Sequence, residues 1–411
     1  MENVKGYKCI KCGTEFNLDD IAYICEKCKG NLQIIYDYQF IKKKLKKSDF
    51  AENTDYSIWR YKDLLPVKDL SKKPVVHIGW TPLYKADKSG AHLGLKNLYI
   101  KDDGRNPSAS LKDRPGAIAV VKALERDEKA ITCASTGNAA SSLACLTAAL
   151  GLKTIIFVPE AAPSAKIAQL LVFGAFVIAV KGSYDDAFDL SVKATEKYGW
   201  YSRNSGYNSY TREGKKTCSY EICEQLGWEC PDKIFVPVGD GNLISGMWKG
   251  FVDLYELGFI DRLPQLISCQ AENMDAINRA FESDGVIRPV KGKTVADSIS
   301  VSFPHDGDAA LKAIKESGGF AVSVSDEQII HAIPELARET SVFGEPSGVT
   351  PFAALQRAVC TNKIRDNEKI IIMMSGNGLK DINSAMKSVK GPLTMRPDLK
   401  ELEKIISKGL V

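Results

Sequence analysis

Short apolar runs alternate with longer amphipathic stretches from about residue 98 to residue 374 of the chain. Seven of these runs have the length and the β-branched content of buried strands. They occupy residues 98–100, 130–133, 154–158, 176–180, 233–238, 266–269 and 370–374. Stretches of helical length lie between them, at residues 115–126, 139–150, 165–173 and 184–197. This alternation predicts an α/β fold with parallel sheets, in which loops at the carboxyl ends of the strands bind ligands.

The first 35 residues have a different pattern, with four cysteines and few apolar residues. Two Cys-x2-Cys pairs, separated by 12 residues, consist of Cys9, Cys12, Cys25 and Cys28. Each pair can place two thiolates on one tight turn, and two such turns complete a tetrahedral zinc site. Because protein would supply all four ligands, we expect a structural zinc ribbon rather than a catalytic metal. Free thiols are the plainer alternative, and a redox pair would need a thioredoxin-like context that is absent from the sequence.

Composition narrows the class of protein. The chain has 411 residues, 44% hydrophobic and 26% charged, with a net charge of +4. This length suggests two or three domains. The 11 cysteines, an odd number in a large chain, argue against a secreted disulfide framework. The lysine-rich run at residues 42–47 is short enough to be a solvated helix face, and no apolar run of membrane-spanning length occurs. We therefore expect a cytoplasmic protein with neither a membrane nor a nucleic-acid partner.

A lysine stands where a predicted strand runs into a predicted helix. Residues 104–115 read Gly-Arg-Asn-Pro-Ser-Ala-Ser-Leu-Lys-Asp-Arg-Pro, and Pro115 suits a first helical turn. Lys112 would lie at the helix entrance, where the positive end of the helix dipole disfavours its ammonium form. A lowered pKa is what a lysine needs to form a Schiff base. The plainer interpretation is a solvated surface lysine.

The predicted strand at residues 130–133 runs into a Ser-Thr-Gly-Asn turn at residues 135–138. A turn of this kind offers backbone N–H and hydroxyl groups to an anion, and one amide to a phenolate or carbonyl oxygen. A simple N-cap cluster would have the same residue types. The turn is therefore a candidate ligand site.

Two further predicted strands end in loops whose backbone or side-chain groups could bind a ligand. Residues 239–246 read Gly-Asp-Gly-Asn-Leu-Ile-Ser-Gly and precede a helix that we expect to begin near Met247. The glycines allow a phosphate-binding nest of N–H groups, although the spacing does not match a dinucleotide site. Asp240 is an unexpected acid beside a phosphate, so we expect its carboxylate to point away. Ser375, directly after residues 370–374, should present its hydroxyl at the same end of a sheet.

The lysine loop, the Ser-Thr-Gly-Asn loop, the glycine-rich loop and the C-terminal hydroxyl, in this order, resemble the pyridoxal-phosphate enzymes of the tryptophan-synthase-β fold (fold type II). Within that group, the chain looks like the threonine synthases. Further motifs extend the resemblance over nearly the whole chain, and they lie at residues 204–205, 213–217, 221–231, 235–239, 248–251, 343–346 and 378–380. Many relatives also have an N-terminal zinc ribbon.

The resemblance implies roles for individual residues. Lys112 would bind the cofactor covalently and then move protons, and Asn138 would hydrogen-bond the cofactor's O3′. Main-chain N–H groups would bind the cofactor phosphate at Gly239, Asp240, Gly241, Asn242 and Leu243. Ser375 would face the pyridine nitrogen. A second anion site would bind a substrate phosphate, and its candidate residues are Ser108, Ser110, Arg114, Ser135, Thr136 and Lys166.

The activity that the resemblance implies is conversion of O-phospho-L-homoserine and water to L-threonine and phosphate, in a homodimer. Two departures from the family pattern keep an alternative open. The lysine loop reads Pro-Ser-Ala-Ser-Leu-Lys where the family usually has Pro-Thr-Gly-Ser-Phe-Lys, and the glycine loop differs as well. The alternative is a β-replacement enzyme acting on O-phospho-L-serine, such as a cysteate synthase. A non-catalytic regulatory or nucleic-acid-binding protein is a more distant one.

The expected architecture has three parts, in which two parallel-sheet domains follow a small ribbon. The ribbon takes residues 1–35. A large α/β domain takes residues 36–115 and 201–411, and a smaller α/β domain takes residues 116–200. The smaller domain carries Asn138, and we expect it to close over the substrate and expel water.

Overall fold

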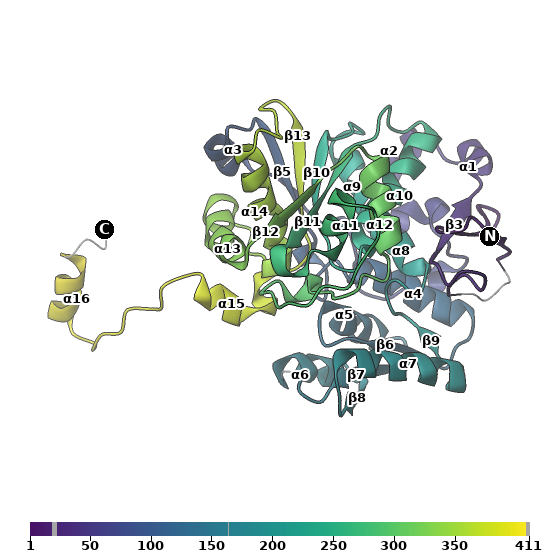
Figure 1. Ribbon diagram of the computed structural model, residues 1–411, viewed down its shortest axis with the longest axis horizontal. Coiled ribbons are helices and arrows are strands. Elements are labelled where there is room, and N and C mark those ends of the chain that lie inside the picture. Colours follow the sequence, from purple (N-terminus) through teal and green to yellow (C-terminus); the bar gives the residue numbers. More distant parts are fainter. Residues whose placement is uncertain (19–22, 163, 408–411) are drawn as a thin grey trace.

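The computed structural model describes residues 1–18, 23–162 and 164–407. Within these ranges the strands form three sheets, of three, six and four strands. Figure 1 shows the six-stranded sheet in the upper body of the molecule, the four-stranded sheet below it and the N-terminal segment at one side. The predicted fold class, two α/β units that follow a small four-cysteine ribbon, is confirmed.

The six-stranded sheet has the order β12-β11-β10-β13-β5-β4. Its strands are β4 (Leu83–Lys85), β5 (Asn97–Asp102), β10 (Lys233–Pro237), β11 (Gln265–Ala271), β12 (Ala321–Val324) and β13 (Lys369–Met374). Four of them match predicted strands. The sequence pattern missed β4 and β12, which have only 3 and 4 residues. All pairs are parallel except β4 with β5, which is antiparallel at the edge.

Helices cover both faces of this sheet. One face carries α9 (Thr217–Gln225), α10 (Asn242–Leu257) and α12 (Gly307–Glu316), and the other carries α13 (Asp326–Thr340) and α14 (Pro346–Cys360) (Figure 1). The expected helix start near Met247 is wrong, because α10 begins at Asn242. Gly246 lies inside the helix, and its lack of a side chain lets α10 pack closely on α8 (Tyr210–Lys215), because a Cβ there would lie 2.9 Å from the Cβ of Lys215. The helix N-terminus therefore lies directly against the glycine-rich loop.

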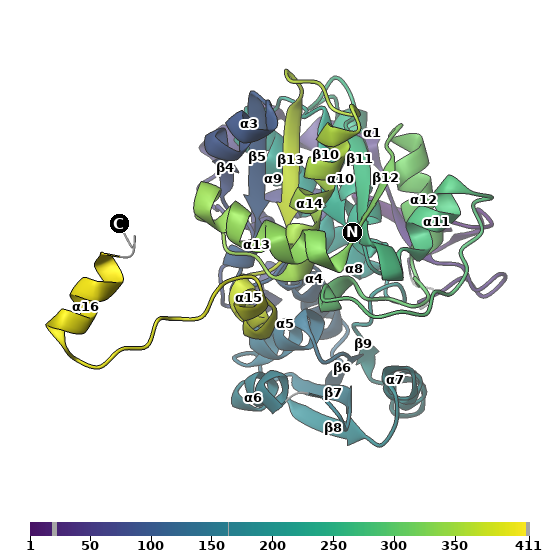
Figure 2. The same cartoon turned by 60° about the vertical axis from the view of Figure 1, so that its left-hand side comes forward.

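The four-stranded sheet is parallel throughout and has the order β8-β7-β6-β9. Its strands are β6 (Ala130–Ala134), β7 (Lys153–Pro159), β8 (Phe176–Val180) and β9 (Tyr201–Ser202). Helices α5 (Asn138–Thr147) and α6 (Ser164–Val172) lie on one side of it, and α7 (Tyr184–Tyr198) lies on the other (Figures 1 and 2). Three predicted strands and three predicted helices are confirmed here. The fourth predicted helix, α4 (Asp113–Glu125), lies between the two large sheets and packs on α5 and α8.

The N-terminal segment forms an antiparallel ribbon of β1 (Val4–Cys9), β2 (Glu15–Phe16) and β3 (Leu32–Tyr36). Tyr7, Leu32 and Ile34 are buried in the same apolar cluster as residues of α4 and α10. The ribbon therefore shares its core with the large α/β unit, as its few apolar residues require. Helices α1 (Tyr38–Lys44) and α2 (Lys47–Glu52) follow it.

Short helices complete the described chain: α3 (Asp87–Leu93), α11 (Ala276–Glu282), α15 (Ile382–Lys387) and α16 (Leu399–Ile406). Helix α16 lies at the end of an extended segment that leaves the body of the molecule (Figures 1 and 2). Among the described helices, none has both the length and the apolar character needed to cross a membrane.

Candidate active site

The lysine loop and the loop after β13 are joined backbone to backbone. The N–H of Leu111 donates to the carbonyl of Ser375 at 2.9 Å, and the N–H of Asn377 donates to the carbonyl of Ala109 at 3.0 Å. Ser110 and Gly376 form an isolated antiparallel bridge between them. Because β5 and β13 are neighbours in the sheet, both loops leave the same edge, and Lys112 and Ser375 come close together in space.

Lys112 is the N-cap of α4. Within the described chain its ammonium has neither a hydrogen bond nor an ion pair. Burial, together with the nearby charge of Arg203, lowers the pKa of Lys112 to about 8, although Glu345 and Asp240 act in the opposite direction. The sequence argument relied on the helix dipole alone. In the structure the desolvated surroundings are the main cause.

The residue that departs from the family's glycine in the lysine loop has the backbone that a glycine would adopt. Ala109 has a φ of 60°, in the left-handed region that non-glycine residues rarely occupy. The loop thus keeps this conformation despite its alanine. The substitution gives no structural reason to place Lys112 differently.

The glycine-rich loop presents free backbone donors. Within the described residues, the N–H groups of Gly239, Asp240 and Gly241 donate to no protein acceptor, and those of Asn242 and Leu243 belong to the first turn of α10, where the backbone has no acceptor. Gly241 has a φ of 91°, and a Cβ there would lie 2.7 Å from the carbonyl oxygen of Asp306. The result is a nest of N–H groups at a helix N-terminus, which suits a phosphate.

Two side chains of this loop are held from outside it. The backbone N–H of His305 donates to Asp240 Oδ1 at 2.7 Å, so that this carboxylate faces the segment around residue 305. Burial and the neighbouring Asp306 raise the pKa of Asp240 to about 7. Lys215 Nζ donates to Asn242 Oδ1 at 2.6 Å, and burial holds the pKa of this lysine well below its ordinary value.

Asn138 begins α5 and faces the other sheet. Its Nδ2 donates to Glu345 Oε1 at 2.8 Å and to Ser298 Oγ at 3.2 Å. The backbone N–H groups of Thr136 and Asn138 have no protein acceptor among the described residues. This end of α5 is therefore a second set of free donors for an anion.

Asn138 and Glu345 line a cleft between the four-stranded and the six-stranded sheets. Thr136 and Lys166 line it from the side of the smaller sheet, and Lys166 pairs there with Asp297 at 2.6 Å. Lys380, from the six-stranded side, donates to Ser141 Oγ at 3.0 Å. The cleft also contains Gly137, Gln169, Val295, Ser298, Pro346, Ser347, Leu379 and Asp381.

Sequence reasoning did not assign roles to Glu345 and Lys380. Burial raises the pKa of Glu345 and lowers that of Lys380. Glu345 lies directly over Gly376, since a Cβ at that glycine would be 2.3 Å from Glu345 Oε1. Their family motifs, at residues 343–346 and 378–380, were the available signal.

The structure does not support the expectation that Arg114 binds a substrate phosphate. Its side chain is fully buried, and its guanidinium is paired with Asp103 and Glu221 and hydrogen-bonded to Thr217. These partners satisfy the guanidinium and hold the start of α4 in place. Arg114 therefore has no free donor for a substrate phosphate.

The three serines that were expected to bind the substrate phosphate differ in their hydrogen bonds. Ser108 Oγ donates to Asp113 at 2.5 Å, so its hydroxyl is engaged inside the lysine loop. Ser110 Oγ is buried and has no hydrogen-bond partner among the described residues. Ser135 Oγ accepts the N–H of Gly137 at 3.1 Å. Among the described residues, Ser110 Oγ thus has no partner, and Ser135 has a hydroxyl hydrogen that donates to no protein acceptor.

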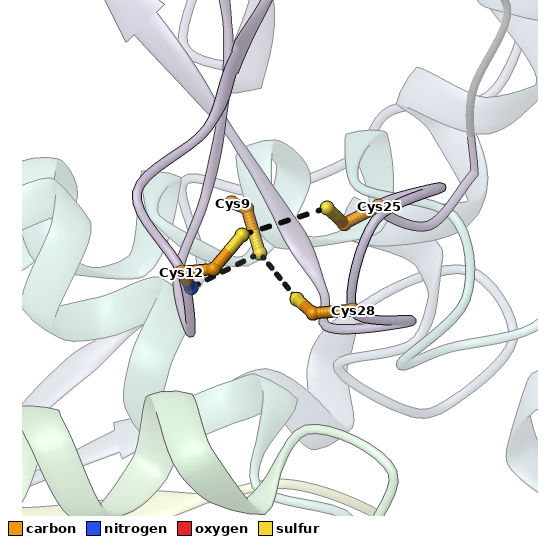
Figure 3. Close-up of side chains that lie close together, drawn as sticks. All are labelled: Cys9, Cys12, Cys25 and Cys28. Atoms are coloured by element: carbon orange, nitrogen blue, oxygen red, sulfur yellow. Dashed lines mark hydrogen bonds between the residues drawn. The ribbon is translucent and has the colours of Figure 1, made fainter.

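The four ribbon cysteines gather in one place. Figure 3 shows their side chains pointing toward one another from two turns. All four Sγ atoms lie within 4.8 Å of one another, with Cys9 and Cys28 at 3.4 Å and Cys12 and Cys25 at 3.7 Å. These separations exceed a disulfide bond of about 2.05 Å and approach the spacing of about 3.8 Å that four thiolates have around a zinc ion. The cluster is compatible with zinc.

Comparison with known proteins agrees with these features. The family model described as "Pyridoxal-phosphate dependent enzyme" matches residues 75–376. Such a cofactor requires an amine for its aldehyde and donors for its phosphate. Lys112, which has no partner among the described residues, and the N–H nest of the glycine-rich loop provide them. The fold and the site thus define a pyridoxal-phosphate-dependent enzyme.

Full-length relatives narrow the family. A threonine synthase of Methanocaldococcus jannaschii is 39% identical over 98% of this chain and 99% of its own length. One from Methanosarcina acetivorans is 37% identical, over 97% of this chain and 98% of its own. The chain belongs to the threonine synthase family.

Solved structures agree on the fold. The processed form of threonine deaminase isoform 2 from Solanum lycopersicum has a TM-score of 0.68 at 23% sequence identity, covering 82% of this chain and 93% of its own. Maize serine racemase has a TM-score of 0.62 at 23% identity, covering 80% and 92%. At this level of identity the likeness concerns the fold alone.

Proposed function

We propose that the protein is a pyridoxal-phosphate-dependent lyase that converts O-phospho-L-homoserine and water to L-threonine and phosphate. The observation that carries this proposal is the match of nearly the whole chain to threonine synthases at up to 39% identity. The meeting of Lys112, Ser375 and the glycine-rich loop at one end of the six-stranded sheet supports it.

Pyridoxal phosphate, when bound, supplies an electron sink that stabilises negative charge developing on the substrate. Lys112 would hold the cofactor covalently, and the N–H groups of residues 239–243 would bind its phosphate. Asn138 would reach its O3′, and the Ser375 hydroxyl would face its ring nitrogen. A neutral hydroxyl there leaves the ring unprotonated, which favours elimination over transamination.

The Lys112 amine would take the proton from the substrate's α-carbon, and a proton from the β-carbon would follow. The bond between Cγ and the phosphate oxygen would then break and release phosphate, and a proton would be returned to Cγ to form the methyl group. Water would add its hydroxyl at Cβ, and a proton returned to Cα would complete threonine. The substrate's two anionic groups would be bound from the cleft, with the α5 N-terminus, Thr136, Lys166, Ser110 and Ser135 as the donors. A closed cleft would orient the substrate and exclude bulk water.

Other features of the proposal concern the whole protein. Zn²⁺ would be held by Cys9, Cys12, Cys25 and Cys28 as a structural ion. Residues 116–200 would form the smaller domain, and residues 36–115 with 201–411 the larger one. The enzyme would act in the cytoplasm as a homodimer on a small phosphorylated amino acid.

The test is product analysis with two substrates. We expect threonine and an equal amount of phosphate from O-phospho-L-homoserine, and no cysteate from O-phospho-L-serine with sulfite. The variant Lys112→Ala should lose both turnover and the violet absorbance of the lysine-bound cofactor, because no other amine can replace it at that position.

The outcomes separate the alternatives. Cysteate formation from phosphoserine would keep the cofactor and Lys112 but replace the proposed reaction with β-replacement. Turnover by the Lys112→Ala variant would overturn the assignment of Lys112. A wild-type protein that binds no pyridoxal phosphate would contradict the enzymatic proposal altogether.

A further inference from the structure

The side chain of Asn31 is one of the described contacts between the ribbon and the segment that holds the cofactor-phosphate loop. This residue follows the second cysteine pair, and its backbone is tied to both turns that carry cysteines. Its carbonyl accepts the N–H of Ile10 at 2.9 Å, and it forms an isolated bridge with Ile24. The adjacent Gly30 packs on the sulfurs, since a Cβ there would lie 3.1 Å from Cys9 Sγ. The position of Asn31 therefore depends on the geometry of the cysteine cluster.

The side chain of Asn31 leaves the ribbon and contacts the large α/β unit. Its Nδ2 donates to Asp306 Oδ1 at 2.6 Å and to the backbone carbonyl of His305 at 2.7 Å. Both acceptors are distant in sequence, 275 and 274 residues away. Asp306 is 1% exposed. A hydrogen bond to a buried carboxylate is among the stronger ones in a protein.

Asp306 is in turn the residue that holds the glycine-rich loop. Its Oδ2 accepts from Asn242 Nδ2 at 2.8 Å and from Ser245 Oγ at 2.7 Å. Its backbone N–H donates to the carbonyl of Asp240 at 3.0 Å. Asp306 thus contacts the loop at residues 240, 242 and 245, and the loop N–H groups can stay free for a phosphate. Arg212 pairs with the same carboxylate and also donates to a ribbon carbonyl.

We propose that Asn31 is a positioning residue through which the four-cysteine ribbon, with its metal, sets the affinity of the glycine-rich loop for the cofactor phosphate. The inference rests on the proposed function, because that function puts the phosphate at this loop. It assigns the ribbon a task beyond stability. A chain of 411 residues can bury a sufficient core without it.

The experiment measures cofactor affinity rather than activity. Full-length protein freed of cofactor is titrated with pyridoxal phosphate and, separately, with pyridoxal, which lacks the phosphate. We expect Asn31→Ala to raise the dissociation constant for pyridoxal phosphate about tenfold and that for pyridoxal less than about twofold, since the change acts at the phosphate end. Glu15→Gln is the matched control, because Glu15 is an exposed ribbon residue whose side chain pairs with Lys8 and has no other ion pair among the described residues.

A second experiment removes the metal from the ribbon. In the wild-type protein, a chelator should weaken pyridoxal phosphate binding by a similar factor of about ten, whereas the Asn31→Ala protein should lose little more. This non-additivity is expected because both changes break the same connection. A merely structural ribbon would give independent effects in the two proteins.

Three results would overturn the inference. They are an Asn31→Ala protein whose affinities match those of Glu15→Gln, equal losses for pyridoxal phosphate and pyridoxal, and additive effects of chelation and substitution. All three presuppose a wild-type protein that binds pyridoxal phosphate at Lys112. A failure of the proposed function is therefore seen first, as an absence of lysine-bound cofactor in the wild type.

Discussion

Lys112 is buried and has no partner among the described residues, and its protonation decides whether it can react. A pKa of about 8 leaves roughly a tenth of the amine neutral at pH 7, about 300-fold more than an ordinary lysine with a pKa of 10.5. Since the neutral amine attacks the cofactor's aldehyde, the rate of covalent capture should rise with pH through about 8 and then level off. Rapid-mixing absorbance measurements of cofactor capture across this range check the midpoint.

The same measurement on Arg203→Met identifies the cause. Removing a cation near Lys112 should move the midpoint to higher pH, because the ammonium form is then less disfavoured. A wild-type midpoint near 10.5 would mean that Lys112 is solvated. An unchanged midpoint in the variant would show that Arg203 has no part in lowering the pKa.

Residues that lie within one continuous motif were recognisable from the sequence, and residues with distant partners were not. Lys112, Ser375 and the glycine-rich loop each follow a strand of clear apolar pattern, so their common edge could be predicted. The role of Arg114 depends on Glu221, 107 residues away, and that of Glu345 depends on Asn138, 207 residues away. Local sequence contains no information on such pairs.

At the scale of elements, the start of α4 is held by a buried network of charges. Arg114 joins Asp103 and Glu221, and Lys101 also donates to Glu221, at 2.7 Å. Burial alone would raise the pKa of Glu221, but the charges of Arg114 and Lys101 lower it to about 2. Because Lys112 lies two residues before Arg114, the same network orients the reactive lysine.

Arg114→Met should therefore lower the free energy of unfolding by about 3–5 kcal/mol, since it leaves carboxylates buried without their cation. Urea denaturation measures the change. Arg126→Met, at the other end of α4, is the control and should cost less than about 1 kcal/mol, because its pair with Glu128 is partly exposed. Equal losses for the two variants would contradict a special role for the network.

The elements themselves followed the apolar pattern closely, with two kinds of exception. The edge strands β4, β9 and β12 are too short to produce a recognisable pattern, and neighbouring strands supply their pairing. The start of α10 was placed too late because Gly246 has the character of a loop residue in the sequence. In the structure this glycine lies inside α10, where the close packing of α8 leaves no room for a side chain.

At the scale of the molecule, the described contacts across the cleft are polar, which suits a boundary that opens and closes. Lys380 donates from the six-stranded side to Ser141 of α5 and, at 3.3 Å, to Gln169 of α6. Asn138 and Lys166 reach back across the cleft to Glu345 and Asp297. Polar contacts of this kind can break and re-form at little cost in water, unlike an apolar core.

Lys380→Met should shift the cleft toward its open form, because both bonds to the smaller unit are lost. We expect KM for the phosphorylated substrate to rise about tenfold, with the absorbance of the lysine-bound cofactor unchanged, since Lys112 and the phosphate loop are untouched. Backbone hydrogen exchange in α5 and α6 should accelerate in the same variant. Lys312→Met, an exposed lysine on α12, is the control. A normal KM and unchanged exchange in Lys380→Met would show that these contacts do not hold the cleft closed.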